Sequence, residues 1–279
     1  MRRLGVHTSI AGGIHLSLDR AKDLGCNTVQ IFSHNPRTWL IKTIPEDSVL
    51  RFMELRRAYD IAPVFIHTSY LINLSSSNSE VLNKSIQLLI HEMDIADRLG
   101  ADYVILHTGS ASGDTKDSGR KKAVEALKKA FKGRLWGSKL LLENTAGERG
   151  DVSPRIRDLA KIIRETDSPS IAGICIDTCH AFAAGYDISG RKGLSEFIRK
   201  IEAYTGLDRV KLIHLNDSKR DLNSRVDRHE HIGRGYIGRE GLRRFINHPA
   251  FENVPLILET PKESDEDDVR NLKVVRGMV

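Results

Sequence analysis

The sequence predicts a single-domain α/β protein, spanning residues 1–279, with the (β/α)8 or TIM-barrel fold. Eight short runs rich in Val, Ile and Leu alternate with stretches whose apolar residues recur at helical spacing, and this alternation is typical of a parallel α/β barrel. The length of 279 residues also suits one such barrel. No GxGxxG or Walker A sequence follows any of the runs, so a nucleotide-binding site has no support.

The predicted strands are short, and most of them end in a residue that can bind a metal. We expect the strands at residues 2–7, 28–33, 62–67, 101–107, 139–143, 171–177, 210–214 and 254–259. In a barrel of this kind the carboxyl ends of all strands open on one face. Side chains that are far apart in the chain would therefore meet at that face. These are His7, His67, His107, Glu143, Asp177, His214 and Glu259.

Helices are predicted in the intervals between the strands. We expect them at residues 14–24, 45–59, 82–99, 120–131, 156–163 and 194–204, and from 264 onward. Pro45 suits the first turn of a helix, because its missing N–H would be unpaired there anyway. Ser264 and Asp267 have the spacing of a capping box, so the last helix is expected to begin at Ser264.

Charge and cysteine content limit the classes of partner. The 43 basic and 37 acidic residues give a formal charge of +6, which permits a nucleic-acid partner without requiring one. Three cysteines without CxxC spacing argue against a disulfide framework and a thiolate zinc site, so we interpret them as buried apolar residues. Polar residues interrupt the first apolar run and no run reaches transmembrane length. We therefore expect a cytoplasmic protein without a membrane partner.

Residues 213–233 carry the densest group of candidate metal ligands. Imidazole nitrogens and carboxylate oxygens are the ligands that suit Zn²⁺, Mn²⁺ or Fe²⁺. Asp227 and His229 are two residues apart, so in an extended chain both side chains point the same way and can bind one ion. The candidates in this segment are His214, Asp217, Asp227, His229 and His231.

The strand-end residues together with this segment exceed what one ion can bind. Zinc usually takes four ligands, and catalytic zinc keeps one position for water. More than one metal is therefore expected. Clustered divalent ions lower the pKa of water and neutralise anionic oxygens, which is what phosphoester hydrolysis needs. Hydrolysis of a phosphoester is the predicted chemistry.

Six strings of the sequence resemble the endonuclease IV family. They lie at residues 6–13, 67–74, 142–147, 176–187, 214–219 and 227–235, and the resemblance extends from about residue 2 to residue 263. It implies a trinuclear-zinc barrel that cleaves double-stranded DNA on the 5′ side of abasic sites. The products would be a 3′-hydroxyl and a 5′ deoxyribose phosphate, and blocked 3′ ends would be further substrates. We expect the protein to act as a monomer.

The resemblance also implies a role for individual residues. One zinc would be held by His67, His107 and Glu143, a second by Glu143, Asp177, His214 and Glu259, and a third by His180, Asp227 and His229. Mn²⁺ is an alternative at one or more of these positions. Glu143 would bridge two ions, and Glu259 would help to orient the attacking hydroxide, which makes these two the predicted catalytic residues. His7 and His231 match the pattern as supporting residues rather than ligands.

The predicted DNA contacts lie in loops and are carried over from the same family. They are Asn35, Arg37, Tyr70, Leu71, Arg225 and Arg228. Tyr70 and Leu71 follow His67 closely, so they should lie on the metal-bearing face, either as a wedge inserted into the duplex or packed against a neighbouring loop. The sequence departs from the family at 147–150, where Glu148 would place a negative charge near the DNA.

Two rival functions stay open at this point. A divalent-metal sugar isomerase could share the barrel and several ligands, but such sites usually hold one or two ions and need no loop like the one containing Asp227 and His229. A non-catalytic damage-binding protein would not need all nine ligands, and all nine are present.

Overall fold

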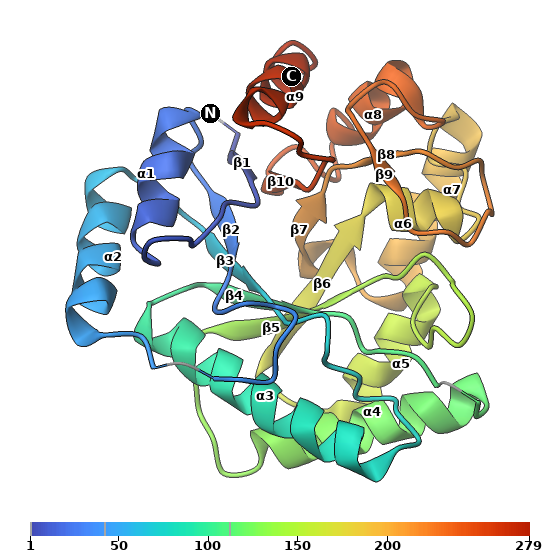
Figure 1. Cartoon of the computed structure of the whole chain (residues 1–279). Helices are drawn as coiled ribbons and strands as arrows, with labels where there is room; N and C mark the ends of the chain where they lie inside the picture. The colour runs from blue at the N-terminus through green and yellow to red at the C-terminus, as the bar shows by residue number, and fades with distance from the viewer. Residues whose placement is uncertain (1, 42, 112) are drawn as a thin grey trace.

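The computed structural model of the protein describes residues 2–41, 43–111 and 113–279. Eight parallel strands form one sheet in the order β1-β10-β7-β6-β5-β4-β3-β2 (Figure 1). Their bounds are β1 Leu4–Val6, β2 Val29–Phe32, β3 Val64–His67, β4 Tyr103–Leu106, β5 Lys139–Glu143, β6 Ile171–Asp177, β7 Val210–His214 and β10 Leu256–Leu258. Each strand lies within its predicted range, which confirms the barrel fold.

The sheet closes between its first two strands. A bridge joins His7, just after β1, to Gln30 of β2, and the N–H of Thr8 donates to the carbonyl of Gln30 at 2.9 Å. The opposite edge of β1 pairs with β10, the last strand in the chain. The first strand, β1, therefore lies between β2 and the last strand, β10.

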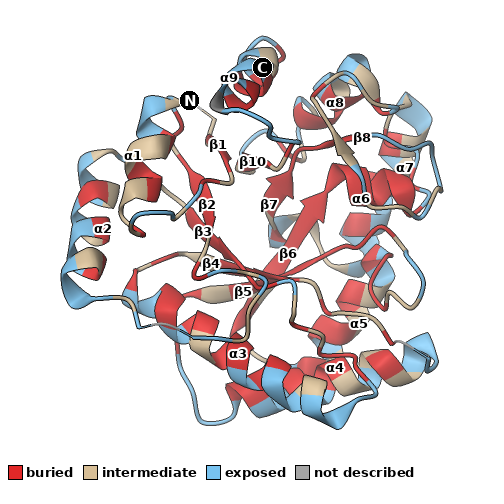
Figure 2. Cartoon of the chain, viewed as in Figure 1, coloured by how far each residue is buried: buried red, intermediate tan, exposed pale blue. Residues whose placement is uncertain are grey.

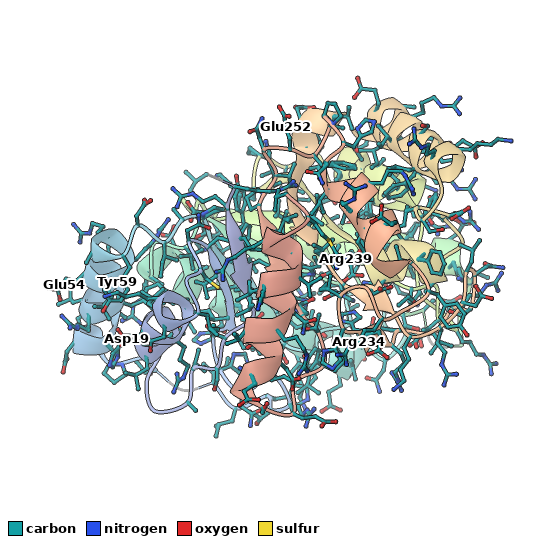
Figure 3. The ribbon with its side chains drawn as sticks, turned by 90° about the horizontal axis from the view of Figure 1, so that it is seen from above. Asp19, Glu54, Tyr59, Arg234, Arg239 and Glu252 are labelled. Carbon is teal, nitrogen blue, oxygen red and sulfur yellow. The ribbon has the colours of Figure 1, made fainter. Side chains whose placement is uncertain are left out.

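The helices surround the barrel and turn their apolar sides toward it (Figure 2). They are α1 Leu16–Asp23, α2 Glu46–Ala58, α3 Ser79–Arg98, α4 Lys116–Phe131, α5 Ile156–Thr166, α6 Thr178–Ala183, α7 Arg191–Tyr204, α8 Gly238–Ile246 and α9 Asp265–Arg276, with a 3₁₀ turn η1 at Leu207–Arg209. Neighbouring helices are also tied by polar contacts. Viewed from above, Tyr59 lies beside α1, where its hydroxyl donates to Asp19 at 2.8 Å (Figure 3).

Two helices were not predicted. The helix α6 has only six residues and begins directly after Asp177, whose side chain accepts the N–H of His180 at 2.7 Å as the N-cap. A helix this short shows no apolar periodicity in the sequence. The helix α8 begins at Gly238 and is nine residues long; no element was predicted there, although Leu242, Phe245 and Ile246 have helical spacing and are buried. The capping box of Ser264 and Asp267 at the start of α9 is confirmed.

The interior of the barrel contains one layer of fully buried side chains. Each of its six members comes from a different strand, and together they fill the centre of the barrel. They are Phe65, Ile105, Leu141, Cys175, Leu212 and Ile257. All three cysteines are buried and unpaired, as expected. Among the described residues, no helix has the length and apolarity that crossing a bilayer requires.

Candidate metal centre

The candidate metal ligands lie one step above the interior apolar layer. In a strand, residues two apart point to the same face, so each residue two positions after a layer member also points into the barrel. These residues are His67, His107, Glu143, Asp177, His214 and Glu259. The same period that packs the barrel interior therefore brings six of the nine predicted ligands to its mouth.

Glu143 lies at the centre of this group and is fully buried. Its Oε2 atom is 3.3 Å from Nε2 of His67 and 2.9 Å from Nε2 of His107. Its other oxygen, Oε1, is 3.1 Å from Nδ1 of His214. His214 in turn lies 3.1 Å from Oε2 of Glu259. One carboxylate thus faces imidazoles from three other strands or strand ends.

The remaining three candidates come from α6 and from the segment that leads into and begins β9, which pairs with β8 (Asp217–Ser218 with His229–Glu230). Asp227 Oδ2 is 3.1 Å from His180 Nε2, and its Oδ1 is 3.4 Å from His229 Nε2. His229 also approaches Asp177 Oδ2 at 3.6 Å, which places this trio beside the first group.

The ligand atoms fall into the three sets that the family resemblance implies. In each set the donor atoms lie within 4.8 Å of one another. The sets are His67, His107 and Glu143; Glu143, Asp177, His214 and Glu259; and His180, Asp227 and His229. Their role as ligands remains a prediction, while their convergence is a property of the fold.

The histidines are oriented as metal ligands usually are. His67 Nδ1 lies 2.8 Å from the carbonyl oxygen of Thr68, and His229 Nδ1 lies 2.8 Å from that of Glu259. These contacts fix the proton on Nδ1 and leave Nε2 as a lone-pair donor toward the cluster. His180 is held likewise, with Nδ1 2.9 Å from the carbonyl oxygen of Asn144.

Several buried atoms in the cluster form no hydrogen bond. Within the described part of the chain these include His180 Nε2, His229 Nε2 and Glu143 Oε2. A buried polar atom without a partner costs about 1–3 kcal/mol. Here the unpaired atoms are all lone-pair donors that converge on one another, so the residues fit a group of divalent cations.

The electrostatics of the cluster also favour bound cations. Burial acts to raise the pKa of Glu143, but the nearby His107 and His214 outweigh it and hold that pKa well below its usual value. Burial acts to lower the pKa of His180, yet the charges of Asp177 and its neighbours raise that pKa well above the usual value. The buried Glu143 carboxylate therefore stays ionised and favours positive charge close by.

Gln30 is a buried residue of the site that the sequence did not reveal as functional. Its Nε2 atom donates to Glu259 Oε1 at 2.6 Å and lies 3.0 Å from His7 Nδ1. Its Oε1 atom is 2.7 Å from His214 Nε2. The available clue in the sequence was the polar amide of Gln30 between the apolar residues Val29 and Ile31. Gln30 orients one predicted ligand from each of two strands.

Two asparagines beside the ligands have the same orienting role. Asn144 Oδ1 accepts the N–H of Asp177 at 2.9 Å. Asn216 Nδ2 donates to Asp177 Oδ2 at 2.6 Å, and its Oδ1 accepts the N–H of Glu259 at 2.9 Å. Each asparagine follows a predicted ligand by one or two positions, and this proximity was the available clue.

Other candidates from the dense segment lie outside these sets. Asp217 is fully buried and accepts N–H groups from Gly233, Gly235 and Ile237, each at 3.0 Å, so it organises the loop before α8. His231 Nδ1 contacts Asn271 Nδ2 at 3.1 Å. His7 approaches Glu259 Oε1 at 3.6 Å. His7 thus lies beside a predicted ligand, and the supporting roles of His7 and His231 remain predictions.

Two buried cysteines lie beside the candidate ligands. Cys175 and Cys179 each lie within reach of two candidate ligands. Burial raises the pKa of both thiols to about 12. Without a bound cation these thiols stay protonated, and neither belongs to the nine ligands that the family resemblance implies.

The centre opens into a cavity of about 510 Å³ that Tyr70, Arg228 and Pro261 also line. The predicted DNA contacts Asn35, Arg37, Arg225 and Arg228 are exposed, and within the described residues none of the three arginines has an ion-pair partner. Their role as DNA contacts remains a prediction.

Tyr70 and Leu71 occupy the corner of a tight turn at the cavity edge. The N–H of Ile72 donates to the carbonyl of Ser69 at 3.2 Å. The side chain of Tyr70 is 64% exposed, and its ring meets Phe32 edge-on at 5.2 Å. Leu71 is half-buried. Tyr70 is thus exposed although its ring packs against Phe32, and these observations leave both the wedge and the packing interpretation open.

Glu148 has a structural contact as well as an exposed charge. Its Oε1 atom accepts the N–H of Asp227 at 3.2 Å. The departure from the family pattern at this position therefore connects the loop after β5 to the loop that carries a predicted metal ligand.

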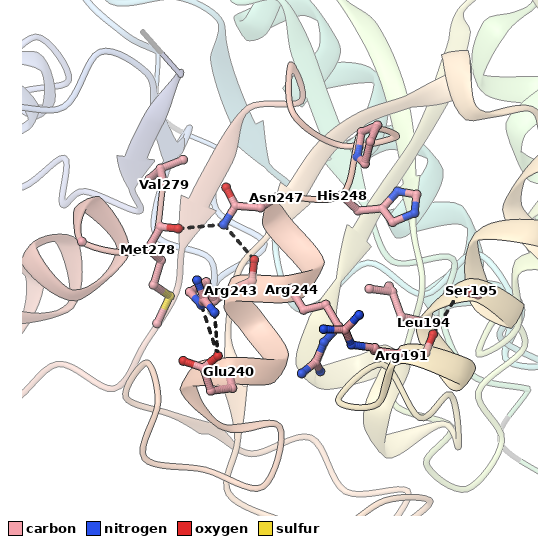
Figure 4. A pocket seen from close by; sticks show the side chains of 12 residues that line it. Arg191, Leu194, Ser195, Glu240, Arg243, Arg244, Asn247, His248, Met278 and Val279 are labelled. Atoms are coloured by element: carbon pink, nitrogen blue, oxygen red, sulfur yellow. Dashed lines mark hydrogen bonds and ion pairs between the residues drawn. The ribbon is translucent and has the colours of Figure 1, made fainter.

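A larger surface hollow lies elsewhere. It measures about 850 Å³ and is bounded by α7, α8 and the C-terminal residues (Figure 4). Glu240 on its wall pairs with Arg243 at 2.9 Å, and Asn247 donates to the carbonyl of Met278 at 2.7 Å. The described residues that line it include no group of converging metal ligands, so size alone does not identify the site.

Comparison with known proteins agrees with the fold. A family described as a xylose isomerase-like TIM barrel matches residues 18–276. A probable endonuclease 4 of Halothermothrix orenii is 41% identical over 275 residues, covering 98% of this chain and 99% of the relative. The crystal structure of endonuclease IV from Thermus thermophilus matches with a TM-score of 0.87 at 38% identity, covering 99% of this chain and 98% of that one.

A D-tagatose 3-epimerase-like protein matches with a TM-score of 0.73 at 18% identity, over 98% of this chain and 96% of that one. At this identity the match shows a shared fold alone. The endonuclease matches cover nearly the whole chain at about twice the sequence identity of the epimerase match, so they decide the family. The chain belongs to the endonuclease IV family.

Proposed function

We propose that this protein is a metal-dependent endonuclease that hydrolyses double-stranded DNA on the 5′ side of abasic sites. The products are a 3′-hydroxyl and a 5′ deoxyribose phosphate, and blocked 3′ ends are further substrates. The observation that carries the proposal is the cluster around Glu143, where ligand atoms from distant segments of a member of the endonuclease IV family converge at the barrel mouth.

The proposed cofactor is a set of three zinc ions. His67, His107 and Glu143 would hold one, Glu143, Asp177, His214 and Glu259 a second, and His180, Asp227 and His229 a third. Divalent ions held so closely acidify water and neutralise anionic phosphate oxygens. Zinc is proposed over Mn²⁺ because imidazoles supply more than half of the donor residues.

The protein's own contribution is to fix charge and orientation. Glu259 is held by Gln30 on one oxygen and faces His214 on the other. Burial acts to raise the pKa of Glu259, but His214 and His7 lower it below its usual value. The carboxylate is therefore ionised and ready to orient an attacking water toward the phosphorus.

The loops around the cavity would hold the duplex. Arg37, Arg225 and Arg228 are exposed cations without ion-pair partners in the described chain, as phosphate contacts require. Tyr70 and Leu71 would act as the wedge that enters the duplex where a base is missing, because unstacking costs least there. We propose that the protein acts as a monomer of one domain.

The rival functions are less well supported. The sugar epimerases that match this chain do so at identities of 13–18%, which reflects the fold alone. A non-catalytic damage-binding protein would not need the buried, unpaired donor atoms that His180, His229 and Glu143 present.

The proposal is tested by metal analysis together with a nicking assay. Purified protein should contain about three divalent ions per chain, and it should nick a duplex with one abasic site while leaving the intact duplex whole. Removal of the ions with a chelator should abolish nicking, and added Zn²⁺ should restore it. A stoichiometry near one, or nicking that survives chelation, would contradict the proposal.

A further inference from the structure

A buried acid contacts the two segments that follow β2 and β3, and it is not part of the candidate metal centre. Glu92 of α3 is 1% exposed. Its Oε1 atom accepts the backbone N–H of Ser69 at 3.0 Å and lies 3.5 Å from Nδ1 of His34. One side chain on a surrounding helix therefore contacts both the segment after β2 and the segment after β3.

Ser69 connects these two segments directly. Its hydroxyl donates to the carbonyl of Pro36 at 2.7 Å and accepts the N–H of Leu71 at 3.2 Å. Its carbonyl accepts the N–H of Ile72, which closes the turn that presents Tyr70. Every polar group of Ser69 is thus used, and the bond to Glu92 fixes the backbone from which the others extend.

The segment at 33–39 is organised from its own side. Asn35 Oδ1 accepts the N–H of Arg37 at 3.0 Å, and the carbonyl of Asn35 accepts the N–H of Thr38 at 3.3 Å. His34, which is also buried, lies 2.9 Å from the hydroxyl of Ser33. The two segments run side by side at the barrel mouth (Figure 1), joined where Ser69 meets Pro36.

The chemical state of Glu92 suits a fixed structural acceptor. Burial raises the pKa of this carboxyl to about 8, and the N–H of Ser69 acts against that rise. The acid is therefore largely uncharged at neutral pH. Burying it costs less than burying an ion, and the acceptor toward Ser69 is retained. Metal binding plays no part, because in the described chain neither Glu92 nor His34 belongs to a group of candidate ligands.

We propose that Glu92 is a positioning residue that holds the turn of Tyr70 and Leu71 against the segment of Asn35 and Arg37, so that the damage-sensing and phosphate-binding elements move as one unit. The carboxyl acts through Ser69 and touches neither substrate nor metal. The link to DNA rests on the proposed function. The mechanical coupling of the two segments does not.

Glu92→Met tests the coupling, because it fills a similar buried volume without an acceptor for Ser69. Hydrogen exchange of the metal-loaded protein should become at least about tenfold faster in peptides covering both 69–72 and 33–39. Glu92→Gln is expected to restore wild-type exchange, because its carbonyl oxygen replaces the acceptor. A variant in which exchange at 33–39 is unchanged, or a glutamine variant as damaged as the methionine variant, would overturn the proposal.

Ser85→Ala is the matched control. Ser85 lies on the same helix, and its Oγ accepts the N–H of Asn73 at 2.9 Å, beyond the turn. Its loss should speed exchange near Asn73 only. If Glu92→Met does not fold, Ser69→Ala removes the hydroxyl bridge to Pro36 and should give the same fast exchange at 33–39, and unchanged exchange there would equally overturn the coupling.

The DNA readout separates this inference from the proposed function. Glu92→Met should lower the preference for an abasic over an intact duplex at least about fivefold while metal content stays at the wild-type value. Wild-type protein without any such preference would refute the proposed function, and the exchange experiment would still decide the role of Glu92. A retained preference in a variant with fast exchange would show that positioning by Glu92 does not serve recognition.

Discussion

The double substitution Tyr70→Ala with Leu71→Ala tests whether this pair senses the missing base. In the free protein the pair contributes little to folding. Tyr70 is 64% exposed, and the ring contact with Phe32 at 5.2 Å is edge-on. A contact of this kind is worth about 0.5–1.5 kcal/mol. With the half-buried Leu71 included, the loss should be about 1–2 kcal/mol, which lowers the Tm by roughly 2–8 °C.

The expected effect on recognition is larger than the effect on folding. A side chain that stacks on a base contributes about 1–3 kcal/mol, and this corresponds to roughly a 5- to 150-fold change in binding. The whole of that change should fall on the abasic duplex, because an intact base stack does not admit the wedge. Metal content should not change, because both residues lie outside the ligand sets.

Binding can be measured by fluorescence anisotropy in a Glu259→Gln background, so that the substrate stays whole. The two duplexes should differ only at the abasic position and be compared at one salt concentration, because phosphate contacts depend on salt. Equal losses on the damaged and the intact duplex would refute insertion. A Tm lower by more than about 10 °C would instead assign the pair a packing role.

Three further predictions concern single residues. Glu259→Gln should slow nicking by about 10²–10⁴-fold at unchanged Tm, and nicking at the wild-type rate would exclude an orienting role for this carboxylate. Arg37→Ala should weaken binding to abasic and intact duplexes alike and reduce the salt slope by about 1, whereas a change confined to one duplex would contradict a phosphate contact. The carboxyl pKa of Glu92 is raised from 4.5 to about 8 by burial, so between these pH values the folded state binds more protons than the unfolded state and stability falls as pH rises. Denaturant unfolding of wild type and Glu92→Gln at a series of pH values spanning this interval should show this loss in the wild type alone, and parallel curves would show that Glu92 titrates normally.

The convergence of most candidate ligands could be predicted from the sequence, because strand ends in a barrel open on one face. A polar residue such as Glu143 at the end of an apolar strand reaches the barrel mouth whatever the loops do. The period of two along a strand then fixes its direction, as it does for His67 above Phe65. Both the strand-end position and the side-chain direction depend only on residues close together in the chain, so one sequence is enough to predict them.

The supporting residues could not be predicted in the same way. The role of Gln30 depends on contacts with His214 and Glu259, which lie in distant strands. Asp217 has the same chemistry as a metal ligand, but the loop after it folds back and surrounds its oxygens with N–H groups. Whether a buried carboxylate meets a cation or an N–H group is decided by such loop conformations, and no periodicity encodes them.

The seam between β1 and β10 has a consequence for how the protein is made. His67, the first of the nine predicted ligands in the chain, is synthesised long before Glu259, which follows β10. Chains are built from the N-terminus, and distant strands pair only once both exist. A nascent chain therefore carries eight of the nine predicted ligands before Glu259 is made, and the second predicted set stays incomplete until β10 pairs with β1 and β7. Premature termination after His229 and before Glu259 would remove one predicted ligand of the second set and leave the other two sets intact in sequence.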